Sequence, residues 1–195
     1  MAHRTDDELT RGLDHVRRAP TDGGTVDLVV RRPGVDEREI LAEGRLDPTV
    51  GLVGDTWPER GSKRTADGGP HPDMQLNLIG ARFSRLVADD DAHRALAGDQ
   101  LHLDLDLSEA NLPPGTRLAL GTAVIEITDQ PHRGCAKFVD RFGAAAARLV
   151  NSPEGRALHL RGVNARVVVG GRVRPGDRVA KVAGSADRAE GAGDR

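Results

Sequence analysis

Short runs of alternating hydrophobic and polar residues dominate the chain and predict β-strands. The clearest run spans residues 101–107, where leucine occupies every second position, a pattern typical of a half-exposed strand. Similar runs predict further strands over residues 25–31, 40–46, 74–79, 118–120, 123–128, 163–169, 172–173 and 178–182. The glycine pair at 170–171 predicts a hairpin between two of these strands. We therefore expect a β-rich domain that closes as a barrel or a bent sheet.

Helical periodicity is confined to a few short segments. Residues 5–18 place Leu9 and Leu13 on one face, and Thr5 with Glu8 forms a capping box. Shorter helices are expected over residues 81–88, 89–96 and 144–150, followed by a turn over 151–155. The acidic triplet 89–91 suits a helix start, because carboxylates stabilise the positive end of the helix dipole. The predicted fold class is mainly β, a β-rich α+β domain with a few peripheral short helices.

The organisation predicted from the sequence is one domain with short extensions, for which 195 residues are sufficient. We expect an N-terminal helix and linker over 1–24, a β-barrel-like domain over 25–183, and a disordered tail over 184–195. The tail is small, charged and without pattern. Inside the domain, the polar, glycine-rich segment 58–72 is either a flexible lid or simply a mobile loop.

Composition excludes several classes of partner. A formal net charge of −2 gives no general attraction to nucleic acid or membranes, and four aromatic residues offer few rings for base stacking. A single cysteine cannot form an internal disulfide, and no signal peptide or membrane-spanning run is visible. We expect a cytoplasmic protein with no nucleic-acid and no membrane partner. The sequence does not determine its oligomeric state.

The candidate chemistry gathers in residues 130–143, which contain the only cysteine. Cys135 follows a predicted strand, so a rigid scaffold can present it on a loop. Arg133, Lys137 and Arg141 lie within six residues of it, and nearby cations favour the thiolate, which is the nucleophilic and metal-binding form. In the alternative interpretation, the two neighbouring phenylalanines bury the thiol as a small hydrophobe. No Walker loop, Gly-x-Ser-x-Gly nucleophile elbow, dinucleotide fingerprint or His-Glu-x-x-His motif competes with this stretch.

Three stretches resemble the MOSC domain, the module found at the C-terminus of molybdenum-cofactor sulfurases and in stand-alone bacterial proteins. They are Gly-Leu-Val-Gly-Asp at 51–55, Cys-Ala-Lys-Phe at 135–138, and Arg-Gly-Val-Asn-Ala at 161–165 with the glycine turns that follow. The resemblance covers about residues 25–183 and implies a MOSC-type β-barrel-like fold. The chain departs from the family pattern in two places. Ala66 and Asp67 stand where many relatives carry Lys-His, and Gln100 stands where they often carry asparagine.

The resemblance also implies a function. A MOSC-domain protein would bind the molybdenum cofactor (molybdopterin), with Cys135 as the ligand to molybdenum or as a sulfur carrier. Arg133, Lys137, Arg141 and Arg161 would hold the pterin phosphate or lower the pKa of the thiol. Relatives such as the amidoxime-reducing component reduce N-hydroxylated compounds. The expected partners are then a small-molecule substrate and a separate reductase or cofactor-delivery protein.

A second hypothesis is a diverged, non-catalytic β-barrel binding module in which Cys135 is a buried structural residue. The two departures from the family pattern favour this hypothesis, and the retained Cys-x-Lys-Phe opposes it. Two smaller alternatives also stay open. Asp55 either supports the pocket or only caps a turn, and the amides of Gln75 and Asn77 either line a polar cavity or face water. The sequence alone does not decide whether the protein is a molybdenum-dependent oxidoreductase, a sulfur-transfer protein or neither.

Overall fold

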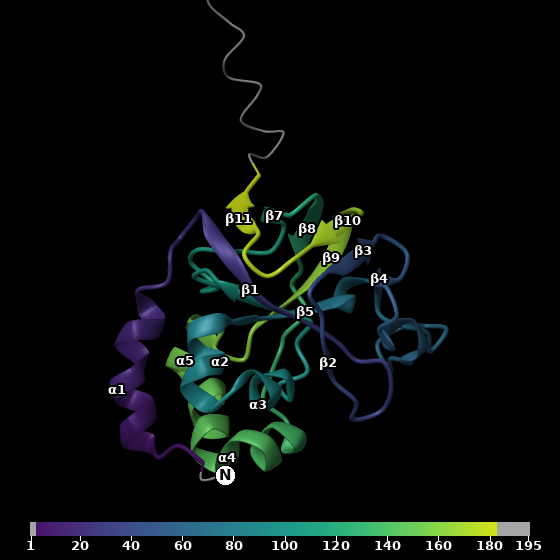
Figure 1. Cartoon of the computed structure of the whole chain (residues 1–195). Helices are drawn as coiled ribbons and strands as arrows, with labels where there is room; N and C mark the ends of the chain where they lie inside the picture. The colour runs from purple at the N-terminus through teal and green to yellow at the C-terminus, as the bar shows by residue number, and fades with distance from the viewer. Residues whose placement is uncertain (1–2, 183–195) are drawn as a thin grey trace, which may run out of the picture.

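The computed structural model describes residues 3–182, and its centre is a closed β-barrel (Figure 1). In ring order the barrel strands are β11 (Arg178–Lys181), β7 (Arg117–Leu120), β8 (Ala123–Ile127), β9 (Val163–Val169), β5 (Leu76–Gly80), β6 (Leu101–Asp104) and β1 (Gly24–Arg31). A pairing between β11 and β1 closes the ring. β5 and β6 are parallel, and the other neighbours in the ring are antiparallel. The expected β-rich barrel is confirmed.

A smaller sheet sits beside the barrel and changes two strand predictions. It contains β3 (Gly44–Asp47), β4 (Gly51–Leu52) and β10 (Gly171–Val173), while β2 (Glu39–Ile40) pairs with β1. The single strand expected over 40–46 is therefore two strands. The expected hairpin between β9 and β10 is wrong, because β10 pairs with β3. Gly171 packs against the backbone of Thr122 so closely that a Cβ would lie 2.5 Å from it.

Leucines fill the barrel interior, but the strand over 101–107 is not half-exposed. Leu101 and Leu103 are fully buried as predicted, yet regular strand ends at Asp104, and His102 on the opposite face is also fully buried. The chain between the parallel strands β5 and β6 forms α2 (Ala81–Val87) and α3 (Asp91–Ala95), as parallel strands require a crossover. His102 Nδ1 lies 3.0 Å from the Ser84 hydroxyl on α2, so this crossover covers the outer face of β6.

The helices gather at one end of the barrel, around a second hydrophobic cluster (Figure 1). α1 (Asp6–Arg17) begins with the predicted capping box of Thr5 and Glu8. α4 (Ala136–Asn151) begins directly after the cysteine and is kinked at Gly143, so helix precedes as well as follows that glycine. α5 (Pro153–Ala157) occupies the expected turn over 151–155. Each helix of the described residues is too short or too polar to span a membrane. The predicted tail, 184–195, lies outside those residues.

Candidate functional site

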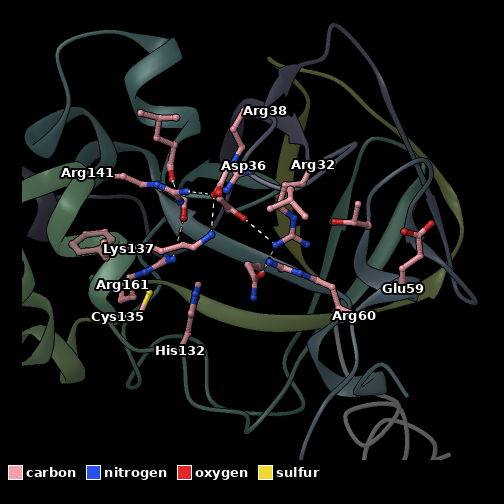
Figure 2. Close-up of a pocket in the computed structure, with 18 residues that line it drawn as sticks. Arg32, Asp36, Arg38, Glu59, Arg60, His132, Cys135, Lys137, Arg141 and Arg161 are labelled. Carbon is pink, nitrogen blue, oxygen red and sulfur yellow. Dashed lines mark hydrogen bonds and ion pairs between the residues drawn. The ribbon is translucent and has the colours of Figure 1, made fainter. Parts of the chain in front are cut away.

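The thiol of Cys135 opens into a pocket between the cysteine loop, the end of β1 and the start of the 58–72 segment (Figure 2). The pocket has a volume of about 330 Å³. Cys135 is exposed and forms the N-cap of α4 without a capping hydrogen bond from its side chain. Phe138 and Phe142 are buried in the helix cluster, and neither covers the sulfur. The interpretation of Cys135 as a buried structural residue is therefore wrong.

A glycine lets the cysteine loop pack tightly before α4 begins. A Cβ on Gly134 would lie 2.8 Å from Val150 and 3.0 Å from Asn151, at the far end of the same helix region. The Asn151 amide donates to the Gly134 carbonyl across 3.4 Å. The loop is thus held at both ends, by β8 before it and by α4 after it, which fixes where Cys135 is presented.

Cations dominate the pocket lining. Six positively charged side chains and only two carboxylates surround the cavity: Arg32, Arg38, Arg60, Lys137, Arg141 and Arg161 against Asp36 and Glu59. Three of the four predicted cofactor-binding cations, Lys137, Arg141 and Arg161, lie here with Cys135. Arg133 does not, because it points to a different cavity on the other side of the cysteine loop. The cofactor-binding role of all four residues stays a prediction.

Arg32 is anchored by a buried carboxylate behind the pocket wall. Asp55 accepts hydrogen bonds from Arg32 Nε at 2.9 Å and Nη2 at 2.7 Å, and from the backbone of Arg32 and Trp57. The side chains of Arg32 and Asp55 are 5% and 0% exposed. Bidentate pairing fixes the guanidinium plane, so Asp55 supports the pocket as well as capping its turn. Arg32 also donates to the Asn77 side chain at 3.1 Å.

Arg161 is held in the same way from the opposite wall. Its Nη1 donates to both oxygens of Asp99, at 3.0 and 2.7 Å, and its guanidinium lies 5.1 Å from the centre of the Phe138 ring. Burial raises the pKa of Asp99, while the attraction of Arg161 acts in the opposite direction. The cation–π contact and the ion pair together hold the Arg161 guanidinium in place at the pocket wall.

Lys137 and Arg141 share a carboxylate that belongs to the loop after β1. Asp36 accepts from Lys137 Nζ and from Arg141 Nη2, each at 2.8 Å. These contacts, the Lys137 hydrogen bond first, lower the pKa of Asp36. Asp36 adopts a left-handed backbone conformation, with φ of 59°. An acidic side chain of the protein therefore occupies the position that an anionic ligand of these two cations would take.

Arg38 and Arg60 have no carboxylate partner among residues 3–182. The Nε atom of Arg38 is buried without any hydrogen-bond acceptor. Burial lowers the pKa of both side chains, and repulsion lowers it further, from Arg141 and Arg32 for Arg38 and from Arg32 for Arg60. Both charges would be stabilised by an anion in the pocket, because crowded cations disfavour their own charged forms.

Sequence reasoning missed Arg32, Arg38 and Arg60. Arg32 and Arg38 flank a charged turn after a strand, and Arg60 opens the 58–72 segment, which was predicted only as a lid or mobile loop. No local spacing links these three arginines to the cysteine. The one usable signal was the Gly-Asp element at 54–55, since the buried Asp55 requires a cation to pair with it.

The polar wall between β5 and β9 settles the alternatives for the amides. Asn77 lines the pocket, donates to Asn164 and accepts from Arg32. Gln75 lies behind it, where it donates to Pro48 and accepts from Val167. Gln100, at one departure from the family pattern, binds the backbone of Asn77 and Gln75. The Gln100 side chain therefore has a structural role, because it holds the backbone of β5 and of the residue before it.

These features define a class of protein. The family profile described as the MOSC domain matches residues 89–180, which include Asp99, Cys135 and Arg161. The resemblance to the MOSC domain is therefore confirmed for residues 89–180.

Among solved structures, the chain is similar to the YuaD protein from Bacillus subtilis and to YiiM from Escherichia coli. The YuaD match has a TM-score of 0.60 at 15% identity and covers 80% of this chain and 93% of YuaD. The YiiM match has a TM-score of 0.52 at 20% identity and covers 82% of this chain and 70% of YiiM. At these identities the likeness concerns the fold alone. No curated protein matches the chain.

Proposed function

We propose that the Cys135 pocket binds the molybdenum cofactor and that the loaded protein reduces N-hydroxylated small molecules. One observation carries this proposal: an exposed thiol shares a cavity with the half-buried Arg38 and the exposed Arg60, which have no carboxylate partner among residues 3–182. A thiolate is a ligand for soft metals. Unpaired guanidinium groups are suited to a phosphate, which they bind through paired hydrogen bonds.

The residues present fit such a group. Cys135 would supply the protein ligand to molybdenum, and Arg38 with Arg60 would hold the phosphate of the pterin. Arg32 and Arg161, each fixed by a buried carboxylate, would border the bound group with rigid positive charge. The cofactor, when bound, supplies the redox chemistry, while the protein supplies binding, orientation and electrostatics.

The chain's own residues would prepare the site for an anion. Lys137 and Arg141 are already neutralised by Asp36, so they would contribute only after this carboxylate moves aside. The supply of electrons would require a separate reductase, since the described residues contain one thiol and no cluster of metal ligands. Sulfur carriage by Cys135 is the second candidate, and the accessibility of its thiol favours it.

Metal and pterin analysis tests the proposal. The native protein and the Cys135→Ser, Arg38→Gln, Arg60→Gln and Arg133→Gln variants would be co-expressed with the cofactor pathway and analysed for molybdenum and pterin fluorescence. Arg133→Gln is the matched control, because it removes the same charge from the same chain outside the pocket. We expect molybdenum and pterin in the native protein and in Arg133→Gln, and a loss of both in the Cys135→Ser, Arg38→Gln and Arg60→Gln variants.

The other outcomes separate the alternatives. Pterin in both the native protein and Cys135→Ser would leave recognition to the cations and make the thiol a sulfur carrier or a tuning residue. Neither molybdenum nor pterin in the native protein would overturn the proposal and favour the diverged binding module.

A further inference from the structure

His132 lines two cavities beside the cysteine loop. The first, called here the front cavity, is the Cys135 pocket (Figure 2). The second, called the rear cavity, has a volume of about 390 Å³ and is bordered by residues 109–114, 127–133, 150–156 and 159–163. His132 and Arg161 are the residues that line both. The imidazole therefore forms part of the wall that separates the thiol pocket from the rear cavity.

One ring nitrogen of His132 faces a buried carboxylate. Nδ1 is itself buried, has no hydrogen-bond partner, and lies 3.5 Å from Oδ1 of Asp99. The Asp99 side chain is fully buried, whereas the His132 side chain keeps 13% exposure. Because Nδ1 is buried, this exposure belongs to the rest of the ring. Catalytic hydrogen bonds in unliganded sites are often long and tighten when a ligand binds, so a small rotation would complete the His132–Asp99 pair.

The charges around the ring keep it neutral at rest. Burial lowers the pKa of His132 well below its usual value, and the neighbouring Arg161 and Arg32 lower it further. The charged groups that face it are Asp99, Arg161 and Arg32, with Asp129 and Arg133 on its own loop. A neutral imidazole carries one proton, and a carboxylate beside Nδ1 favours that proton on Nδ1, which leaves Nε2 free to accept another.

We propose that His132, oriented by Asp99, carries protons from water in the rear cavity to the reacting group in the front cavity. The inference rests on the proposed function, because reduction of an N-hydroxylated compound consumes protons at the substrate. The same arrangement, a histidine whose inner nitrogen meets a buried carboxylate, orients proton-transfer histidines in unrelated enzymes.

The chemistry balances with one external reductant. R–NHOH takes up two electrons and two protons and gives R–NH2 and water. Nε2 of His132 first takes a proton from water in the rear cavity, which makes the ring an imidazolium and leaves hydroxide. The N–O bond then breaks, its electron pair leaves on oxygen, and the oxygen takes that proton from Nε2. The nitrogen receives the two electrons, which originate from a reduced flavin or iron–sulfur donor, together with the second proton. His132 is then again neutral with its proton on Nδ1, and protons from the solvent neutralise the hydroxide.

Rescue of a truncated histidine tests this role directly. The cofactor-loaded native protein and the His132→Ala, His132→Gln and His159→Gln variants would be assayed with an N-hydroxylated amidine and a reduced viologen. We expect kcat of both His132 variants to fall about 10²-fold or more, with KM and cofactor content close to native. Added imidazole should restore His132→Ala, where it has room to bind, and not His132→Gln. His159→Gln, in the rear cavity but bonded to the Leu107 carbonyl, should behave as native.

A measurement without cofactor tests the orientation by Asp99. Nitrogen-15 NMR of the histidines should show His132 neutral at pH 6, with its proton on Nδ1, and Asp99→Asn should reduce the population of this tautomer. A proton on Nε2 in the native protein would overturn the pairing. Native kcat in His132→Ala, or a loss of kcat that imidazole does not rescue, would overturn proton transfer alone. A native protein without molybdenum and pterin would overturn the proposed function and this role together.

Discussion

At the scale of single residues, the charges of the pocket divide by the partners that each cation has. Arg32 and Arg161 are tied to buried carboxylates, Lys137 and Arg141 share the exposed Asp36, and only Arg38 and Arg60 are left for a ligand. A buried ion pair is fixed by its surroundings, whereas an exposed one contributes little and exchanges readily. Asp36 is therefore the carboxylate that a bound anion can displace.

Replacement of this carboxylate should strengthen anion binding. We expect Asp36→Asn to raise the affinity for inorganic phosphate about two- to tenfold at low salt, because Lys137 and Arg141 lose their internal competitor. Isothermal titration calorimetry would measure it. Glu37→Gln removes the same charge from the same loop without touching either cation and should leave the affinity unchanged. Equal affinities in both variants would show that Asp36 does not compete with anions.

The buried His102 should make stability depend on pH. Burial, with Arg94 next, lowers its pKa to about 3, against about 6.5 in the unfolded chain. The unfolded chain thus binds a proton below pH 6.5 that the folded protein does not take up until about pH 3. The contribution of His102 is complete above pH 6.5 and is lost as the pH falls, by about 1.4 kcal/mol per pH unit.

Urea unfolding between pH 4.5 and 7.5 would measure this slope. His102→Asn keeps a donor toward the Ser84 hydroxyl but does not titrate, so its slope should be shallower by the contribution of one proton. His15→Asn, at an exposed position, should keep the native slope. A native slope in His102→Asn would contradict the assignment.

A residue of the site could be predicted only where its neighbours in the sequence form a distinctive pattern. Cys135 with its sequence neighbours could be found, because a unique thiol among cations is a local pattern. Arg38 and Arg60 could not, since a surface arginine and a pocket arginine look alike until the fold sets their partners. The exposure of Cys135 also depended on the fold. Phe138 and Phe142 turn toward α1 and α2 instead of covering the sulfur.

At the scale of elements, periodicity predicted most strands and the first helix, and it failed where tertiary contacts decide. His102 alternates with leucines as a solvent-facing residue would, yet the α2–α3 crossover buries it. The alanine-rich run after Gly143 predicts a helix over residues 144–150 only. The structure has helix on both sides of that glycine, joined by a residue with φ of 87° and ψ of 163°.

That joint gives a prediction about stability. Gly143→Ala should lower the free energy of unfolding by about 1–3 kcal/mol, because this backbone conformation is almost confined to glycine. A Cβ there would also lie 2.7 Å from His3. Chemical denaturation would measure the loss. Gly80→Ala is the control, since Gly80 has φ of −63° and open space around its Cβ, and its stability should change by less than about 1 kcal/mol. Equal effects of both substitutions would contradict a strained joint.

At the scale of the whole molecule, the barrel is closed by few contacts. β1 and β11 pair over Gly24 with Val179 and Thr25 with Arg178, and Val179 is fully buried. We expect Val179→Asp to destabilise the fold by more than about 3 kcal/mol, because it places a charge in the barrel interior. Thermal unfolding followed by circular dichroism would measure it. Arg178→Ala, its exposed neighbour, should remain close to native, and a native melting temperature for Val179→Asp would show that closure does not depend on this residue.

Because the first and last strands of the barrel are partners, folding during synthesis has a fixed order of completion. When the ribosome has translated as far as β9, the chain already contains Cys135 and the six cations of the pocket. The edges of β1 and β7, however, still lack β11, the strand that pairs with both. Long-range pairing of this kind is slow, and unpaired edges attract other chains. The sheet that carries the pocket therefore stays open until residues 178–181 have left the exit tunnel and paired with both edges.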